Sequence, residues 1–410
     1  MDNKLLEKYA DVIVSTGINL QEGDCVEIIG GVEALDLLRE IVRLCWRKGA
    51  ADVLVDIHDP EMALSKYEEA RTEVFDQFPN ERRDFAESLL KAKYHQISIG
   101  APLLDLFQNV DPDRQARWRR TSAKAREPLM QYMDKGDIKW VVAAAPSRKW
   151  AEKVFPHLTG NEAIDALWHQ IFKMCRIDHD DPVTAWKLHD WILRIHAQWL
   201  NIQAFDYLHY RGPGTDLTVG LADRHTWVGG SSMTPDKIAY MANIPTEEIF
   251  TAPHALRVDG YVRATKPLIH MGHVLENFTL RFEKGSVVDF SCDHNGSVLE
   301  ELLSLDEGAR RLGEVAIVPN STPISQSGIL FYSTLFDENA SCHFALGSSY
   351  AESIIGGAEM TKEERFEMGA NYSMTHVDFM VGGPELDVVG FQKDGTEVPV
   401  LIKGEWAVDL

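Results

Sequence analysis

The stretch GDCVEIIGGVEALDLLREIVRLCWRKGAADVLVDIH, residues 23–58, decides the class of the N-terminal fold. It begins with an apolar run typical of a strand, continues at 32–50 with helical periodicity, and ends at 51–58 with a second apolar run. Two further strand-like runs, KYHQISIG at 93–100 and IKWVVAAAP at 138–146, continue the alternation. Strands that alternate with helices predict a parallel sheet flanked by helices.

The glycine pair Gly30-Gly31 ends the first predicted strand, where a phosphate-binding loop could begin. Loops of that kind carry the pattern GxGxxG, or end in GKS or GKT. Neither pattern occurs in this chain at that place. The sequence therefore does not favour a nucleotide cofactor.

The segment from about residue 111 to residue 203 has helical patterns and is rich in tryptophan. We expect core packing from its seven indoles, Trp118, Trp140, Trp150, Trp168, Trp186, Trp191 and Trp199. The same segment holds a positive run formed by Arg114, Arg117, Arg119, Arg120, Lys124 and Arg126. This run is either a solvated helix face or a contact for a substrate carboxylate or a partner.

After about residue 200 the chain consists of short alternating segments with turn sequences between them. EKGS at 283–286 and KDGT at 393–396 are typical of antiparallel hairpins. One helical segment, NGSVLEELLSLDEGARRL, interrupts the strands, with Asn295 or Ser297 as its N-cap. We therefore expect an α/β protein, mixed α+β overall, with an N-terminal helix-flanked sheet domain at 1–200 and a C-terminal mixed α/β domain at 201–410.

Length and composition indicate a globular enzyme. The chain has 410 residues, 45% of them hydrophobic and 25% charged, which is enough for two domains with sizeable cores. A formal charge of −22 argues against a nucleic-acid partner, because phosphates require a basic surface. No apolar stretch approaches the length of a membrane span, and the charged N-terminus does not look like a signal peptide. Five scattered cysteines without a CxxC pattern suit the cytoplasm.

Carboxylates and imidazoles gather in the segment 314–378, and this region is the candidate functional site. It contains Glu314, Glu338, His343, Tyr350, His376 and Asp378, and the acidic pair Glu247-Glu248 lies upstream in PTEEIFTAP. In THVDFMVGG, polar and apolar residues alternate, so His376 and Asp378 are predicted to share one face of a strand. Each residue alone would more often be structural or solvated. Their clustering favours a metal site.

Metal chemistry explains why these residue types would occur together. Imidazole suits zinc, cobalt or a related transition metal, whereas carboxylates bind harder cations and can bridge two ions. Two ions roughly 3.5–4 Å apart lower the pKa of a shared water and polarise a carbonyl, so hydrolysis is the expected chemistry. Cys342, next to His343, is an alternative nucleophile, but neighbours along a strand point to opposite faces.

Several motifs, in this order, carry a resemblance to a known family: PTEEIFTAP, ALRVDGYVRATKPL, LFDENASCHFALG and THVDFMVGG. The chain resembles the thermophilic-type metalloaminopeptidases, the family of aminopeptidase T and aminopeptidase S. NLQEGDCVEI and GTDLTVGL extend the resemblance over essentially the full length. The resemblance implies two divalent metal ions, peptide substrates with a free N-terminus, and a two-domain homodimer whose active site lies in a closed-off interior.

Residue by residue, the resemblance implies metal ligands at Glu248, Glu314, His343, His376 and Asp378, with Tyr350 catalytic and Glu338 close to the metals. Adjacency does not decide between Glu247 and Glu248, and Glu248 is chosen because its place in PTEEIF fits the family position. Glu338 is either a ligand or the base. In a consistent mechanism the two cations activate a water, Glu338 or a bound carboxylate accepts its proton, and Tyr350 donates a hydrogen bond to the oxyanion.

Two other function classes remain open. One is a metal hydrolase that acts on a small amide or an amidine instead of a peptide. The other is a metal-dependent scaffold without catalysis, against which Tyr350 argues, because a binding protein needs no oxyanion donor. Ligand type bounds the metal only loosely, to zinc, cobalt or manganese.

Overall fold

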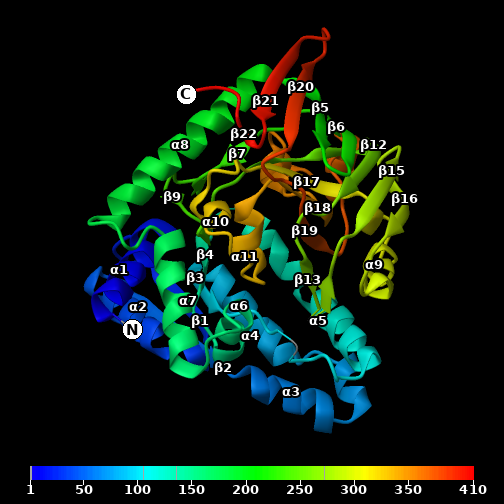
Figure 1. Ribbon diagram of the computed structural model, residues 1–410. Coiled ribbons are helices and arrows are strands. Elements are labelled where there is room, and N and C mark those ends of the chain that lie inside the picture. Colours follow the sequence, from blue (N-terminus) through cyan, green and yellow to red (C-terminus); the bar gives the residue numbers. More distant parts are fainter. Residues whose placement is uncertain (1, 105, 135, 272) are drawn as a thin grey trace. The chain divides into compact units, whose positions relative to one another are not determined.

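The computed structural model describes residues 2–104, 106–134, 136–271 and 273–410. The chain forms two compact units, coloured along the sequence in Figure 1. The first contains the chain up to Leu188 together with Ser231–Pro245, and the second contains His189–Gly230 and Thr246–Leu410. The division falls inside α8 (Pro182–Gln203), the helix that also contains the expected boundary near residue 200. Ser231–Pro245 also belongs to the first unit, although the expected boundary placed this segment in the second domain.

The first unit is built on a five-stranded sheet in which all pairs are parallel. Its order is β10-β4-β3-β1-β2, with β1 at Cys25–Gly31, β2 at Asp52–His58, β3 at Tyr94–Gly100, β4 at Trp140–Ala144 and β10 at Asn243–Ile244. β1 to β4 coincide with the four apolar runs identified in the sequence. The predicted parallel sheet is therefore confirmed.

Helices flank this sheet (Figure 1). They are α1 (Asn3–Val12), α2 (Leu35–Arg47), α3 (Pro60–Glu69), α4 (Asn80–Lys91), α5 (Pro112–Asp134), α6 (Arg148–Val154) and α7 (Gly160–Met174). In α2 the buried Leu37, Ile41 and Cys45 recur at every fourth position. They therefore form one stripe along the helix, which packs on the sheet.

The tryptophans of the middle segment mostly pack as expected. Trp150 and Trp186 are fully buried, whereas Trp191 is 56% exposed. In the basic run, Arg117 pairs with Asp76 at 3.2 Å and with Asp113 at 3.0 Å. These ion pairs lie within the first unit and account for Arg117 as part of a solvated helix face.

The second unit contains an eight-stranded antiparallel sheet of order β16-β15-β12-β6-β5-β20-β21-β22. The strands are β5 (Phe205–Gly212), β6 (Thr215–Leu221), β12 (Pro253–Arg263), β15 (Thr279–Glu283), β16 (Ser286–Ser291), β20 (Asp387–Gln392), β21 (Glu397–Ile402) and β22 (Glu405–Trp406). The predicted EKGS and KDGT hairpins are confirmed as β15–β16 and β20–β21. Asn295 is the N-cap residue of α9 (Gly296–Leu303), but its side chain donates to the carbonyl of Val274 instead of capping the helix.

A five-stranded antiparallel sheet of order β19-β18-β17-β11-β7 completes the core of this unit. Its strands are β7 (Val228–Gly229), β11 (Ile249–Thr251), β17 (Leu312–Ile317), β18 (His343–Gly347) and β19 (His376–Met380). One face of the sheet is apolar and joins the core shared with the eight-stranded sheet, where the rings of Phe344 and Tyr210 lie 4.9 Å apart. The opposite face is free to carry polar groups.

Short elements complete the two units. They are α10 (Pro323–Gln326), α11 (Thr334–Asp337), α12 (Lys362–Glu367), the pair β8 (Ser232–Met233) and β9 (Ala239–Tyr240), and the pair β13 (Leu268–His270) and β14 (His273–Leu275). Within the described ranges, no helix has both the length and the apolar character that a membrane crossing requires.

Candidate metal centre

Strand register brings the candidate ligands together on the polar face of the five-stranded sheet. Ala345 of β18 lies opposite Glu314 of β17 on one side and opposite Asp378 of β19 on the other. His376 precedes Asp378 by two residues, and His343 precedes Ala345 by two, so all four polar side chains leave the same face. The intervening residues point to the core, as Phe344 shows.

Small residues leave room for these side chains to converge. Ala316, opposite His343, and Ala345 are fully buried and offer only a methyl group. Gly347, opposite His376, has a φ of +115°, and a Cβ there would approach the carbonyl oxygen of Thr375 to 2.1 Å. Glycine is therefore required at this point, where β18 and β19 approach each other closely.

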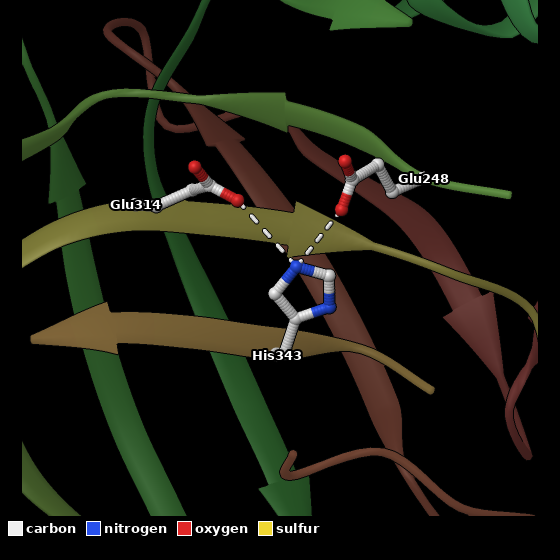
Figure 2. Close-up of side chains that lie close together, drawn as sticks. All are labelled: Glu248, Glu314 and His343. Atoms are coloured by element: carbon white, nitrogen blue, oxygen red, sulfur yellow. Dashed lines mark ion pairs between the residues drawn. The ribbon is translucent and has the colours of Figure 1, made fainter. Parts of the chain in front are cut away.

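One group of ligand atoms contains Glu248, Glu314 and His343. Figure 2 shows both carboxylates pointing at the same imidazole nitrogen. His343 Nε2 lies 3.0 Å from Glu248 Oε2 and 3.4 Å from Glu314 Oε1. All three residues are buried or nearly so, with His343 only 1% exposed. The three atoms together could hold one cation.

A second group contains Glu314, His376 and Asp378. His376 Nε2 lies 3.6 Å from Glu314 Oε2 and 3.2 Å from Asp378 Oδ1. Glu314 thus belongs to both groups and presents one oxygen to each. A carboxylate in this position can bridge two metal ions.

Backbone carbonyls orient both imidazoles. His343 Nδ1 lies 3.1 Å from the carbonyl oxygen of Ser341, and His376 Nδ1 lies 2.7 Å from that of Ser348. When Nδ1 donates to these carbonyls, a neutral ring has its lone pair at Nε2, where a cation shared with the carboxylates could bind. Metal-binding histidines in proteins are commonly held in this way.

The electrostatics show that the carboxylates require positive charge. Burial alone would lower the pKa of His343, but Glu248 and Glu314 raise it well above its usual value. At His376, burial would likewise lower the pKa, but Asp378 and Glu314 raise it to about 10. Burial and neighbouring acids raise the pKa of Glu314. The imidazoles thus take up protons that a divalent cation would replace.

The donor set fits such a cation. His343 Nε2 and Asp378 Oδ1 are buried and have no hydrogen-bond partner of acceptable geometry, although charged atoms lie near each. Buried polar atoms are otherwise almost always satisfied in folded proteins. Nitrogen and oxygen donors in this mixture suit zinc, cobalt or manganese.

Glu338 is buried beside the two groups but belongs to neither among the described residues. Its Oε1 lies 3.4 Å from Nδ2 of Asn339. Burial, followed by the charges of Glu248 and Asp378, raises the pKa of Glu338 well above its usual value. A carboxyl group in this environment is suited to carry a proton.

Tyr350 lies just after β18, and its ring is 4.7 Å from the ring of His376 and 5.7 Å from that of Phe250, centre to centre. The residue as a whole is 45% exposed. Burial, followed by the charges of Glu314 and Asp378, raises the pKa of Tyr350 well above its usual value. The phenol therefore keeps its proton and can donate a hydrogen bond.

Two alternatives from the sequence lie elsewhere. Glu247 belongs to neither group among the described residues, and its Oε2 lies 3.4 Å from Nε2 of His189. The thiol of Cys342 contacts the carbonyl of Val318 in the core, and burial raises its pKa to about 11. It therefore remains protonated at neutral pH and is unsuited to attack.

Sequence reasoning did not identify Asn339 as part of this region. Its side chain is completely buried, accepts a hydrogen bond of 2.6 Å from the backbone N–H of Glu247 and donates one of 3.0 Å to the carbonyl of Leu335. It thereby fixes the segment that carries Glu248. No pattern in the sequence marks such a role, because an asparagine next to an acid is common in loops and caps.

Comparison with known proteins identifies the family of the chain. The family model described as thermophilic metalloprotease matches residues 2–406. Aminopeptidase AmpS of Bacillus subtilis is 43% identical over 402 residues, which cover 98% of each chain, and aminopeptidase T of Thermus thermophilus is 37% identical over 403 residues, again 98% of each. The solved structure of wild-type AmpT from Thermus thermophilus matches with a TM-score of 0.92 at 36% identity and covers 99% of this chain and 100% of that one. The chain therefore belongs to the thermophilic metalloprotease family, as its motifs predicted.

Proposed function

We propose that this protein is a metal-dependent aminopeptidase that releases N-terminal residues from peptides. The observation that carries the proposal is the shared position of Glu314 between two groups of ligand atoms on one face of a sheet. The relatives named as aminopeptidases, at 37–43% identity over nearly the full length, support the same activity.

Two divalent ions, zinc, cobalt or manganese, would be held in this site. Glu248, Glu314 and His343 would hold one, and Glu314, His376 and Asp378 the other. Bound ions of this kind supply an acidified water and polarise the scissile carbonyl. The protein's own contribution is to fix the donors on a rigid sheet and to orient both imidazoles through backbone carbonyls.

Proton transfer would fall to Glu338, with Tyr350 stabilising the developing negative charge. The raised pKa of Glu338 allows the group to take a proton and give it to the leaving amine. Glu338 could also reach a metal ion as a ligand, and its position outside both groups favours the role of base. The Tyr350 phenol would donate a hydrogen bond to the oxyanion.

We further propose that the protein acts in the cytoplasm as a homodimer. All five cysteines are free, which suits a reducing compartment. The dimer rests on the resemblance to the family.

Peptides with a free amine should be hydrolysed, and blocked ones should not. A dipeptide and its N-acetylated form would be incubated with the metal-loaded protein, and released amino acid would be measured. Hydrolysis of the free form alone supports an aminopeptidase, because the amine is then needed for binding. Equal hydrolysis of both would instead favour a general amide hydrolase.

Replacing Glu314 by glutamine should weaken metal binding more than any change outside the ligand set. Removing a residue that only hydrogen-bonds to a ligand lowers the metal affinity about 10–100-fold. For Glu314 itself we therefore expect the metal affinity to fall by at least about 100-fold. The amide keeps the shape of the side chain and relieves the crowding of buried acids, so the metal-free variant should melt no lower than the metal-free parent.

The measurement is a metal titration followed by elemental analysis and thermal unfolding. Glu363→Gln, at an exposed glutamate of α12 in the same unit, is the matched control and should bind metal normally. Normal metal affinity in Glu314→Gln would remove Glu314 from the ligand set.

A further inference from the structure

A cavity of about 400 Å³ opens in the second unit, near the start of β18 and the end of β19. Ala340 and Ser341, just before β18, and Val381 and Gly382, just after β19, line one side of it. Its volume lies within the range of small-molecule pockets. Ser341 precedes His343 by two residues, roughly 7 Å along an extended chain. The cavity therefore lies close to the candidate metal centre, at one edge of the same sheet.

A half-buried lysine, Lys266, also lines the cavity. Lys266 follows Thr265, which is fixed to the strand end by a hydrogen bond of 2.8 Å from Oγ1 to the carbonyl of Gly382 and another of 2.8 Å from its N–H to the carbonyl of Met380. Within the part of the chain that the structure describes, the Lys266 ammonium has no hydrogen bond and no ion pair. An ammonium group carries three N–H donors, and Lys266 is one of the residues that line the cavity.

The acid that acts on this lysine also accepts two backbone hydrogen bonds. Asp337 is the carboxylate whose charge reaches Lys266. Its Oδ1 accepts a hydrogen bond of 2.9 Å from the N–H of Phe331, and its Oδ2 accepts one of 3.0 Å from the N–H of Ser333. Burial is the larger effect at Lys266 and lowers its pKa, while the charge of Asp337 opposes it. An anion placed in the cavity would relieve this cost of burial.

The charge of the lining selects the class of anion. Lys266 and Arg263 contribute two positive charges and Glu385 one negative charge, a net charge of one. This balance fits a monoanion better than a phosphate, which carries close to two charges at neutral pH. Neutral polar groups of Asn320 and Ser325 line the remainder and can hydrogen-bond to a carboxylate or to peptide groups.

We propose that this cavity binds the C-terminal carboxylate of a short peptide whose amino terminus lies at the metal centre, with Lys266 as the recognition residue. The proposal rests on the proposed aminopeptidase function. An extended peptide spans about 3.3–3.6 Å per residue, so a peptide of about two to four residues bridges the distance along the strand. The enzyme is accordingly a peptidase for short peptides with a free carboxyl group.

The test compares trialanine with trialanine amide, which differ only in the terminal carboxylate. Wild-type protein should hydrolyse trialanine with a kcat/KM roughly tenfold higher, as expected for one hydrogen bond to a charged group, and mainly through KM. Lys266→Met should bring the ratio close to one, and Lys266→Arg should restore part of the preference. Lys393→Met, at an exposed lysine in the β20–β21 turn, is the matched control for loss of charge.

Thermal unfolding distinguishes lost recognition from lost folding. Lys266→Met removes a half-buried charge that interacts with buried Asp337, so its melting temperature is compared with that of the wild type, and a single cooperative transition shows that the variant is folded. Equal rates on both peptides in the wild type, or an unchanged ratio in Lys266→Met, would overturn the carboxylate site while leaving the aminopeptidase function intact. Failure of the wild type to hydrolyse either peptide would overturn both.

Discussion

Removing the metal should abolish hydrolysis completely, and adding cobalt, zinc or manganese should restore it. The donors of the two groups converge, because each of the two imidazole Nε2 atoms lies 3.0–3.6 Å from two carboxylate oxygens, and a cation is the ligand that such donors suit. Without a cation, no other described side chain of the site offers the Lewis acid that the proposed reaction needs. Peptidase activity and metal content would be measured on the same samples.

The same cations should raise the melting temperature. A ligand that binds only the folded state stabilises it by about 4 kcal/mol at a concentration 1,000 times its Kd. A chelator saturated beforehand with calcium serves as the control for direct effects of the chelator on the protein. Full activity in protein shown by elemental analysis to be metal-free would refute the dimetal mechanism.

Most of the first unit could be predicted because a local sequence pattern marks each of its longer strands. Each of β1 to β4 is an apolar run long enough to be recognised alone. The fifth strand, β10, has two residues, Asn243 and Ile244, and its parallel pairing with β4 joins positions about a hundred residues apart. Nothing in so short a segment indicates a strand, since only the tertiary fold creates the pairing.

The candidate site was predictable in composition and only partly in geometry. The spacing of His376 and Asp378 placed them on one face, and the structure brings their side-chain atoms to 3.2 Å. The meeting of Glu314 with His343 depends on a register shift between Leu312 and Glu314, which no local pattern specifies. A slip of one residue would turn every side chain of the strand to the other face.

Strand alternation also explains the choice between the two adjacent glutamates. Ile249 packs in the core, so its neighbour Glu248 faces the site, while Glu247 turns to His189. The sequence does not indicate that the carbonyls of Ser341 and Ser348 orient the imidazoles, because every residue carries a carbonyl.

Tyr350→Phe separates catalysis from metal binding. Phenylalanine keeps the ring, and with it the contacts to His376 and Phe250, but removes the hydroxyl. That hydroxyl keeps its proton because burial of its oxygen and the charges of Glu314 and Asp378 disfavour the phenolate. It can therefore act as a hydrogen-bond donor, and its ring lies next to that of His376.

The loss of one such donor typically costs about 10²–10³ in turnover, or roughly 2.7–4 kcal/mol, and we expect kcat of Tyr350→Phe to fall by this amount. Metal stoichiometry and KM should change little, because neither depends mainly on the hydroxyl. Tyr372→Phe removes a different hydroxyl of the same unit, one that accepts a hydrogen bond of 2.6 Å from Lys362, and should leave kcat unchanged. A near-normal kcat in Tyr350→Phe would deny the residue its catalytic role, whereas a loss of metal would make it part of the metal centre, since packing is preserved in both cases.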